Sequence, residues 1–227
     1  MGKNIVQKID DSVRIRTVLV SVSDKKGLDT FIPALVRINP EIRILSTGGT
    51  FTEIGKILGD KAKGILQQVS DYTGQPETQG GLVKTLDFRI YLGLLTETYN
   101  DFHQEDMRAT SSLTIDMVVV NLYPFRETIA KDGVTCENAR GNIDIGGPTM
   151  IRAAAKNFIR VASVVDPDSY LDIVKSLEVN DGCLSLRERF ALSRKAFKHT
   201  ADYDTTIAGY LDTLDIDDVA ACYRSGE

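Results

Sequence analysis

The sequence has 227 residues, of which 42% are hydrophobic and 26% charged, with a net charge of -5. These values are ordinary for one large globular domain and give no general attraction to nucleic acid. No run approaches the roughly 20 apolar residues that span a bilayer, and the first residues lack a secretion signal. We therefore expect a cytoplasmic protein with neither membrane nor nucleic-acid partners.

The three cysteines and two histidines are too widely separated to indicate a disulfide framework or a zinc site. We therefore expect no metal in this protein.

The first half of the chain alternates between strand and helix patterns. Residues 17–22 form a β-branched apolar run typical of a buried parallel strand. Helical spacing follows over residues 27–36, with Ser23 or Asp24 as the expected cap. A second strand at 42–45 leads through a glycine-rich turn into another helix. This order predicts βαβ units.

Further strands are expected at 64–69, 115–120 and 160–165, the second of these being the clearest central strand. The fold class is therefore α/β with a mostly parallel sheet, extended towards the C-terminus by a strand and helices.

The segment between the third and fourth strands is less regular. Residues 70–81 predict a long ordered loop, and loops of this length are often functional. We expect residues 83–86 and 90–95 to carry the chain back through the sheet region. Residues 99–109 are expected to be helical.

The C-terminal third is predicted to be helical. Residues 185–188 form a capping-box pattern, and four apolar side chains beyond it are spaced for one buried helical face. These four are Tyr203, Ile207, Tyr210 and Leu214. We expect one domain over residues 12–214, with flexible tails at 1–11 and 215–227.

Residues 142–156 combine a carboxylate, a glycine pair and a helix. Gly146 and Gly147 allow close approach to the backbone, and Pro148 suits the first helical turn. Asp144 precedes the helix, whose free N–H groups attract negative charge, and Lys156 lies further along it. The segment is either an acid–base site or a loop before a helix with solvated basic residues.

A second glycine-rich turn, at residues 46–50, combines hydroxyl groups with free backbone N–H groups. It is a candidate phosphate cradle that matches neither a Walker A loop nor a dinucleotide fingerprint. Lys25 and Lys84 could reach the same pocket. The alternative is a plain turn beside solvated lysines.

Several long motifs in register resemble the inosine monophosphate (IMP) cyclohydrolase domain of the bifunctional purine-synthesis protein, whose other domain is an AICAR transformylase. The resemblance covers roughly residues 18–211. Its motifs are residues 19–27, 45–50, 69–74, 83–86, 116–125, 142–149, 153–157 and 195–200.

The resemblance implies a methylglyoxal-synthase-like fold with three αβα layers. It also implies the last step of purine nucleotide synthesis, in which 5-formamidoimidazole-4-carboxamide ribonucleotide (FAICAR) closes its ring to IMP and loses water. This activity belongs to the cyclic amidine hydrolases. The ring closure is intramolecular, so no cofactor or metal is required.

The family's functional positions transfer to this chain residue by residue. The catalytic positions fall on Lys84, Asp144, Lys156 and Tyr123. Lys84 is expected to stabilise charge on the formyl oxygen, and Asp144 with Lys156 to form a proton-transfer pair. The substrate-binding positions fall on Ser21, Ser23, Lys25, Ser46, Thr47, Gly48, Gly49, Thr50, Val83, Thr85, Leu86, Asn121, Leu122, Ile145, Gly146 and Gly147.

The chain departs from the family pattern beside Lys84. Leu82 stands where the family has an arginine, and Asp87-Phe-Arg where it has His-Pro-Lys. Arg152 or Arg89 could replace the missing arginine. The departures leave open a non-catalytic, purine-nucleotide-binding regulatory module of the same fold, while methylglyoxal synthase itself rests only on the shared fold.

The transformylase part of the family is absent from this sequence. We therefore expect a stand-alone cyclohydrolase supplied with FAICAR by a separate transformylase. The family commonly forms dimers, so a homodimer is also expected.

Overall fold

The computed structural model describes residues 5–76 and 83–224. Within them, a five-stranded parallel sheet has the order β4-β3-β2-β5-β6, with β2 at its centre. The strands are β2 (Thr17–Val22), β3 (Arg43–Ser46), β4 (Leu66–Gln68), β5 (Met117–Asn121) and β6 (Ala162–Val164). The predicted α/β class and parallel sheet are confirmed.

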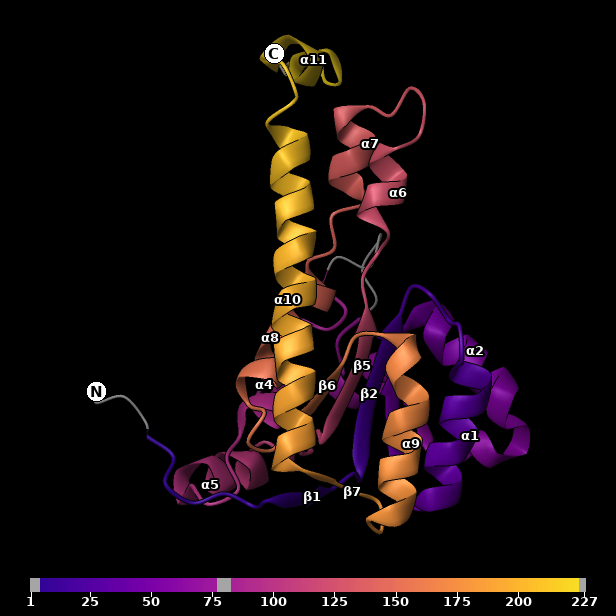
Figure 1. Cartoon of the computed structure of the whole chain (residues 1–227), viewed down its shortest axis with the longest axis vertical. Helices are drawn as coiled ribbons and strands as arrows, with labels where there is room; N and C mark the ends of the chain where they lie inside the picture. The colour runs from indigo at the N-terminus through magenta and orange to yellow at the C-terminus, as the bar shows by residue number, and fades with distance from the viewer. Residues whose placement is uncertain (1–4, 77–82, 225–227) are drawn as a thin grey trace.

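Helices cover both faces of this sheet, giving the expected three αβα layers (Figure 1). One face carries α1 (Leu28–Ile38), α2 (Gly48–Leu58) and α9 (Tyr170–Val179). The other carries α4 (Phe88–Leu95), α8 (Gly146–Lys156) and the long α10 (Leu186–Leu211). No helix in the described residues is both long and apolar enough to cross a membrane.

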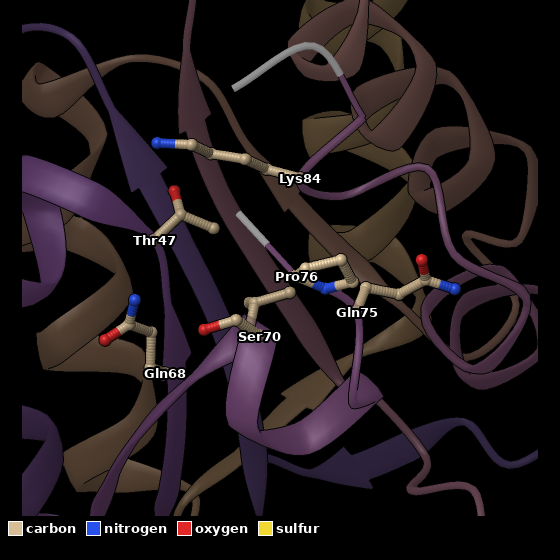
Figure 2. Close-up of a pocket in the computed structure, with 7 residues that line it drawn as sticks. Thr47, Gln68, Ser70, Gln75, Pro76 and Lys84 are labelled. Atoms are coloured by element: carbon tan, nitrogen blue, oxygen red, sulfur yellow. The ribbon is translucent and has the colours of Figure 1, made fainter. Parts of the chain in front are cut away.

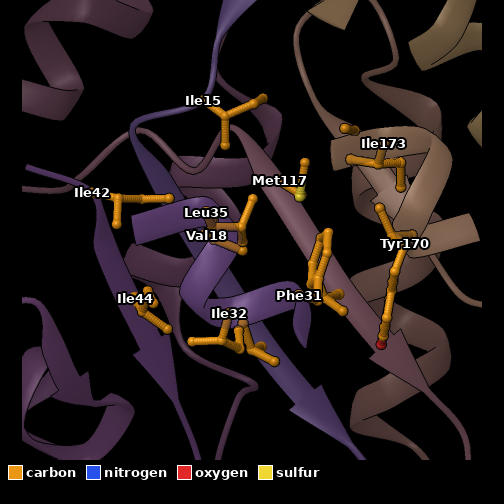
Figure 3. Packing of buried hydrophobic residues seen from close by; sticks show 14 of the residues in the cluster. Ile15, Val18, Phe31, Ile32, Leu35, Ile42, Ile44, Met117, Tyr170 and Ile173 are labelled. Carbon is orange, nitrogen blue, oxygen red and sulfur yellow. The ribbon is translucent and has the colours of Figure 1, made fainter. Parts of the chain in front are cut away.

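The core follows the alternation of side chains along the strands. Val18 and Val20 of β2 are fully buried on the α1 side, whereas Leu19 is fully buried against the layer of α4 and α8. On the α1 side, Phe31 stacks on Tyr170 with ring centroids 4.3 Å apart, which joins α1 to α9 (Figure 3). A strand buried on both faces is continuously apolar, as the sequence of β2 predicts.

The remaining elements are short. They are β1 (Ser12–Arg14), β7 (Cys183–Ser185), α3 (Val69–Thr73), α5 (Asp101–Ala109), α6 (Phe125–Ile129), α7 (Cys136–Gly141), α11 (Ile216–Ala221) and 3-10 turns at Gly59–Ala62 and Pro167–Ser169. Strands β1 and β7 pair antiparallel. Figure 1 shows α6, α7 and α11 beyond the carboxyl end of the sheet, beside the end of α10, with α5, β1 and β7 at the opposite end.

A buried arginine ties the N-terminal segment to the domain. Arg189 of α10 is 0% exposed, and its guanidinium donates hydrogen bonds to five backbone carbonyls. The acceptors are Asp10, Asp11, Phe158, Ile159 and Leu184. Within residues 1–11, which we expect to be a flexible tail, this arginine therefore contacts residues 10 and 11.

The C-terminal segment is also ordered where the structure describes it. Residues 216–221 form α11, and the Tyr223 hydroxyl donates to the Glu137 carboxylate of α7 over 2.6 Å. We expect a flexible tail from residue 215, and residues 215–224 of this segment include α11 and the contact made by Tyr223. Helix α7 provides the surface that this C-terminal segment contacts, and the sequence alone does not reveal that surface.

Two expectations about the middle of the chain need correction. Residues 88–95 form helix α4, capped by the Asp87 carboxylate, which accepts from the backbone N–H of Arg89 over 2.8 Å. The apolar run at 90–95 therefore covers the sheet instead of passing through it. The expected loop at 70–81 begins as α3, and its residues 77–81 lie outside the described residues.

Of the two helix caps that the sequence predicts, the structure shows the one at the start of α10 and not the one at the start of α1. Helix α1 is preceded by Gly27 with φ 77°, and neither Ser23 nor Asp24 caps it. The capping box at the start of α10 is confirmed, because Ser185 and Glu188 exchange side-chain-to-backbone hydrogen bonds. The expected helix over 99–109 is confirmed as α5.

Candidate active site

A cavity of about 430 Å³ lies at the carboxyl ends of β2 and β5, where α2 and α8 begin. Among the described residues that line it, the charged ones are Lys25, Lys84 and Asp144. The other lining groups are hydroxyls, glycines, an amide and apolar side chains. Parallel α/β sheets bind ligands at this edge.

The structure brings most of the predicted site residues to this cavity. Besides the three charged ones, they are Ser21, Ser23, Thr47, Gly48, Gly49, Thr50, Val83, Thr85, Leu86, Asn121, Tyr123, Ile145, Gly146 and Gly147. Five lining residues were not predicted: Val22, Val120, Gly141, Ile143 and Met150. All five lie in or directly beside the motifs that carry the family resemblance, and their place in those motifs is the sequence feature that indicates them.

Two lysine side chains approach the start of α2. Gly48 has φ +45°, and the Lys84 Nζ lies 3.3 Å from where a Cβ atom on this glycine would stand. The Lys25 Cε lies 4.0 Å from the corresponding point on Gly49. Figure 2 shows the Lys84 side chain extending over Thr47. A helix start with free N–H groups and two lysines is suited to bind a phosphate.

The turn that carries Lys84 also packs against the start of α8. The Thr85 hydroxyl lies 2.7 Å from the point where a Cβ atom on Gly146 would stand. A Cβ atom on Gly147 would lie 2.5 Å from a carboxylate oxygen of Asp144. Both positions therefore require glycine, because a Cβ atom at either one would clash with a neighbouring side chain. Residues 84 and 85 connect the two helix starts that border the cavity.

Hydroxyl groups join the ends of β2 and β3 beneath the cavity. The Ser21 and Thr47 hydroxyls are hydrogen-bonded over 3.0 Å. The Thr50 hydroxyl donates to the carbonyl of Val22 over 3.0 Å and accepts from its N–H over 3.1 Å. Thr50 thus fixes the glycine turn against β2, whereas Thr47 stays near the opening beside Lys84.

Asn121 at the end of β5 shapes the turn that presents Lys25. Its side-chain oxygen accepts from the backbone N–H groups of Ser23 and Asp24, over 2.6 and 2.9 Å. Its amide nitrogen donates to the Asp24 carbonyl over 2.8 Å. Asn121, which we predict to contact a ligand, therefore also holds this turn in place.

Asp144 is the carboxylate of the cavity among the described residues. Burial raises its pKa above the ordinary value, while backbone N–H groups of Gly147 and Tyr123 that donate to it lower the pKa. The Gly147 bond measures 2.9 Å. The backbone N–H of Asp144 donates to the Tyr203 hydroxyl of α10 over 2.8 Å. A fixed, partly desolvated carboxylate is suited to accept and return a proton.

Residues 27–149 match a family described as the MGS-like domain. The chain belongs to this MGS-like family. Residues 154–225 match the family of the AICARFT/IMPCHase bienzyme, so the second half of this MGS-like chain carries a further family signature. The resemblance found in the motifs is confirmed.

Relatives of the MGS-like chain agree with these matches. The Bifunctional purine biosynthesis protein PurH of Neisseria meningitidis serogroup C is 48% identical over 213 residues, covering 94% of this chain and 39% of that protein. The protein of the same name from Ruminiclostridium cellulolyticum is 46% identical over 205 residues, covering 89% and 38%. The chain thus spans less than half the length of these relatives.

A solved structure described as "Crystal structure of ForH" is also similar. It is 31% identical, covers 85% of this chain and 95% of its own, and superposes with a TM-score of 0.73. The MGS-like fold is therefore shown by sequence and by structure.

Lys156 does not lie at the cavity. It is exposed at the last position of α8, whereas Gly146 and Gly147 at the first positions line the cavity. With a rise of about 1.5 Å per residue, the two ends of this helix are roughly 15 Å apart. The next residue, Asn157, donates to carbonyls at the end of α4, away from the site. The structure therefore does not bring Lys156 and Asp144 together within one chain.

Two predicted binding residues have buried side chains. Ser46 is 0% exposed, and its hydroxyl donates to the Val20 carbonyl over 2.8 Å. Leu122 is 8% exposed and packs beneath Gly147. Neither residue is among those that line the cavity, so their place in substrate binding stays a prediction.

Neither arginine suggested as a replacement reaches the cavity. Arg89 donates to the Tyr72 carbonyl over 3.0 Å, and the Arg152 guanidinium lies over the Phe197 ring at 5.6 Å. Leu82, the position of the departure itself, lies outside the described residues. In the described ranges, no three His, Cys, Asp or Glu side chains are grouped to hold a metal ion.

Proposed function

We propose that this chain is an IMP cyclohydrolase that closes the ring of FAICAR with loss of water. The observation that carries the proposal is the composition of one cavity, in which two lysines and two helix starts accompany a single described carboxylate, Asp144. The names of the PurH relatives support a purine-synthesis substrate.

The start of α2 is the proposed site of the ribonucleotide phosphate. Gly48 and Gly49 line the cavity in the first turn of α2, where helix N–H groups have no acceptor within the helix. The Lys84 ammonium and the Lys25 side chain lie close to these two glycines. Positive charge and oriented N–H groups together favour a dianion. The Thr47 hydroxyl adds a further donor at the same place.

The reacting arms of the base would then lie towards the start of α8 and Asp144. The carboxamide nitrogen attacks the formyl carbon and loses one proton to Asp144. The formyl oxygen gains negative charge, which the Lys84 ammonium and N–H groups at the start of α8 stabilise. The flexible four-carbon stem of Lys84 lets its ammonium follow this oxygen from the phosphate side.

Dehydration completes the reaction. Asp144 returns its proton to the oxygen, which gives a carbinol. The hydroxyl leaves as the formamide nitrogen loses its proton, so a carbon–nitrogen double bond forms and one water molecule is released. Both steps need only one positioned carboxylate and one cation. Since the two arms belong to one molecule, holding them in reacting geometry supplies a large share of the rate acceleration.

The test is to follow the absorbance change as purified protein converts FAICAR to IMP. We expect turnover without added metal, and a fall in kcat of roughly a thousandfold for Asp144→Asn. The matched control is Asp168→Asn, because Asp168 is an exposed carboxylate paired with Lys26 at the surface. Equal activity of the wild type and Asp144→Asn would contradict the mechanism.

A second function is favoured by the position of Lys156 at the far end of α8. A nucleotide-binding module would need the phosphate cradle but no second proton-transfer group. Binding of IMP without any turnover of FAICAR would select this function over the enzyme.

A further inference from the structure

A tyrosine far away in sequence holds the backbone of Asp144. The Tyr203 phenol oxygen accepts a hydrogen bond from the Asp144 N–H over 2.8 Å, across 59 positions of sequence. Tyr203 belongs to α10, which passes from the amino end of the sheet up to α6 (Figure 1). The contact joins the longest helix of the structure to the loop that carries the carboxylate.

The ring of Tyr203 is itself fixed by packing. It meets Phe125 of α6 edge to face, with centroids 6.2 Å apart and planes at 69°. Phe125 is 2% exposed, so it offers a rigid surface. Tyr210, two turns further along α10, contacts the same ring at 5.9 Å and 81°. Edge-to-face pairs have a defined geometry, which fixes where the Tyr203 hydroxyl lies.

Asp144 is thus held from two sides. Its carboxylate accepts from the N–H of Gly147 at the start of α8. Its own N–H donates in the opposite sense, to Tyr203. Residues 142–145 connect α7 to α8, and the Tyr123 backbone N–H also donates to the carboxylate. The hydrogen bond to Tyr203 is the contact that ties the Asp144 backbone to α10. A misplacement of about 1 Å at a reacting group can cost roughly a hundredfold in rate.

We propose that Tyr203 is a positioning residue, whose hydroxyl anchors the Asp144 backbone so that the carboxylate points into the cavity. This inference rests on the proposed function for its effect on turnover, but the anchoring itself does not depend on any substrate. Tyr203 does not line the cavity among the described residues, so it acts only through Asp144.

The chain offers a matched pair of variants. Tyr203→Phe keeps the ring against Phe125 and removes only the hydroxyl. Tyr210→Phe removes a hydroxyl from the same helix and the same aromatic cluster, and no described hydrogen bond joins that hydroxyl to Asp144. Differences between the two variants therefore report the bond to Asp144 and not the packing.

Amide hydrogen exchange, followed by mass spectrometry on a peptide containing residues 142–147, measures the anchoring. We expect exchange at least five times faster in Tyr203→Phe than in wild type, and no change in Tyr210→Phe. Turnover is measured on the same proteins. In Tyr203→Phe, kcat should fall about five- to tenfold, with KM within twofold, since phosphate binding is untouched.

Unchanged exchange in Tyr203→Phe would overturn the proposal, as would equal effects of the two variants. A lower melting temperature with wild-type kcat would also overturn it, because the residue would then be merely structural. If the wild-type protein turned over no FAICAR, the proposed function would fail. The exchange measurement alone would then decide whether Tyr203 anchors Asp144.

Discussion

The ammonium group of Lys84 lies 3.3 Å from the position that a Cβ atom on Gly48 would occupy. A lysine from the turn before α4 thus rests directly over the start of α2, at the carboxyl edge of the sheet. The next residue, Thr85, touches the start of α8 at Gly146. Two adjacent side chains therefore link the proposed phosphate cradle to the loop of Asp144.

Replacing Lys84 tests the charge that this arrangement supplies. We expect Lys84→Met to lower kcat/KM for FAICAR by roughly a hundred- to a thousandfold, because the cation that stabilises the developing oxyanion is lost. Lys63→Met is the control, since the side chain of this lysine is 86% exposed and is paired with Asp60. A loss in Lys84→Met no larger than that of the control would contradict the role of Lys84.

Gly147→Ala tests the close approach between the start of α8 and the carboxylate. The new methyl group would lie 2.5 Å from an Asp144 oxygen and 2.6 Å from the Leu122 side chain, so one of them must move. We expect kcat to fall by about a hundredfold, measured by steady-state turnover.

The control for this variant is Gly209→Ala. Gly209 lies in α10, and no atom of the described residues lies within 4 Å of the position that a methyl group on it would take, so its replacement should leave turnover unchanged. Full activity of Gly147→Ala would show that the position of Asp144 is not critical.

The pH dependence of kcat/KM reports the ionisation of Asp144 in the free enzyme. A base must be ionised, so activity is expected to fall as the pH drops through its pKa. Burial raises this pKa above the ordinary value of 3.8, so the loss begins at a higher pH than for an exposed aspartate. An acid limb at or below 3.8 would contradict Asp144 as the base.

Lys156→Ala tests whether Lys156 takes part in proton transfer with Asp144, as the motifs indicate, or lies outside the site, as its position in this chain indicates. Lys156 is exposed at the far end of α8, so we expect the variant to retain kcat within about twofold of wild type. A loss of more than tenfold would contradict a site built from one chain and would place Lys156 at the cavity of a second copy.

Much of the fold could be predicted because strands buried on both faces have an unmistakable pattern. The run at 17–22 is β2, and its side chains alternate between the two cores as a parallel strand requires. The run at 90–95 is equally apolar but forms α4. Short apolar runs do not distinguish a strand from a buried helix, and the Asp87 cap was not recognised.

The site could be predicted as far as it depends on the ends of strands. The glycine turn at 46–50 and the stretch at 142–147 meet at one cavity because parallel strands end on one edge. The sequence places Lys156 on a helix, but a helical pattern does not say which end of the helix faces the site. The contact between Tyr203 and Asp144 spans 59 positions and has no local sequence signal.

A crystal structure with IMP bound tests the central claim most directly. The account predicts the phosphate at the start of α2, near the ammonium groups of Lys25 and Lys84, and the base beside Asp144. The contradicting result would be IMP bound elsewhere, for instance in the cavity lined by Arg14, Arg16 and Arg160 at the opposite end of the sheet, with the cavity of Asp144 empty.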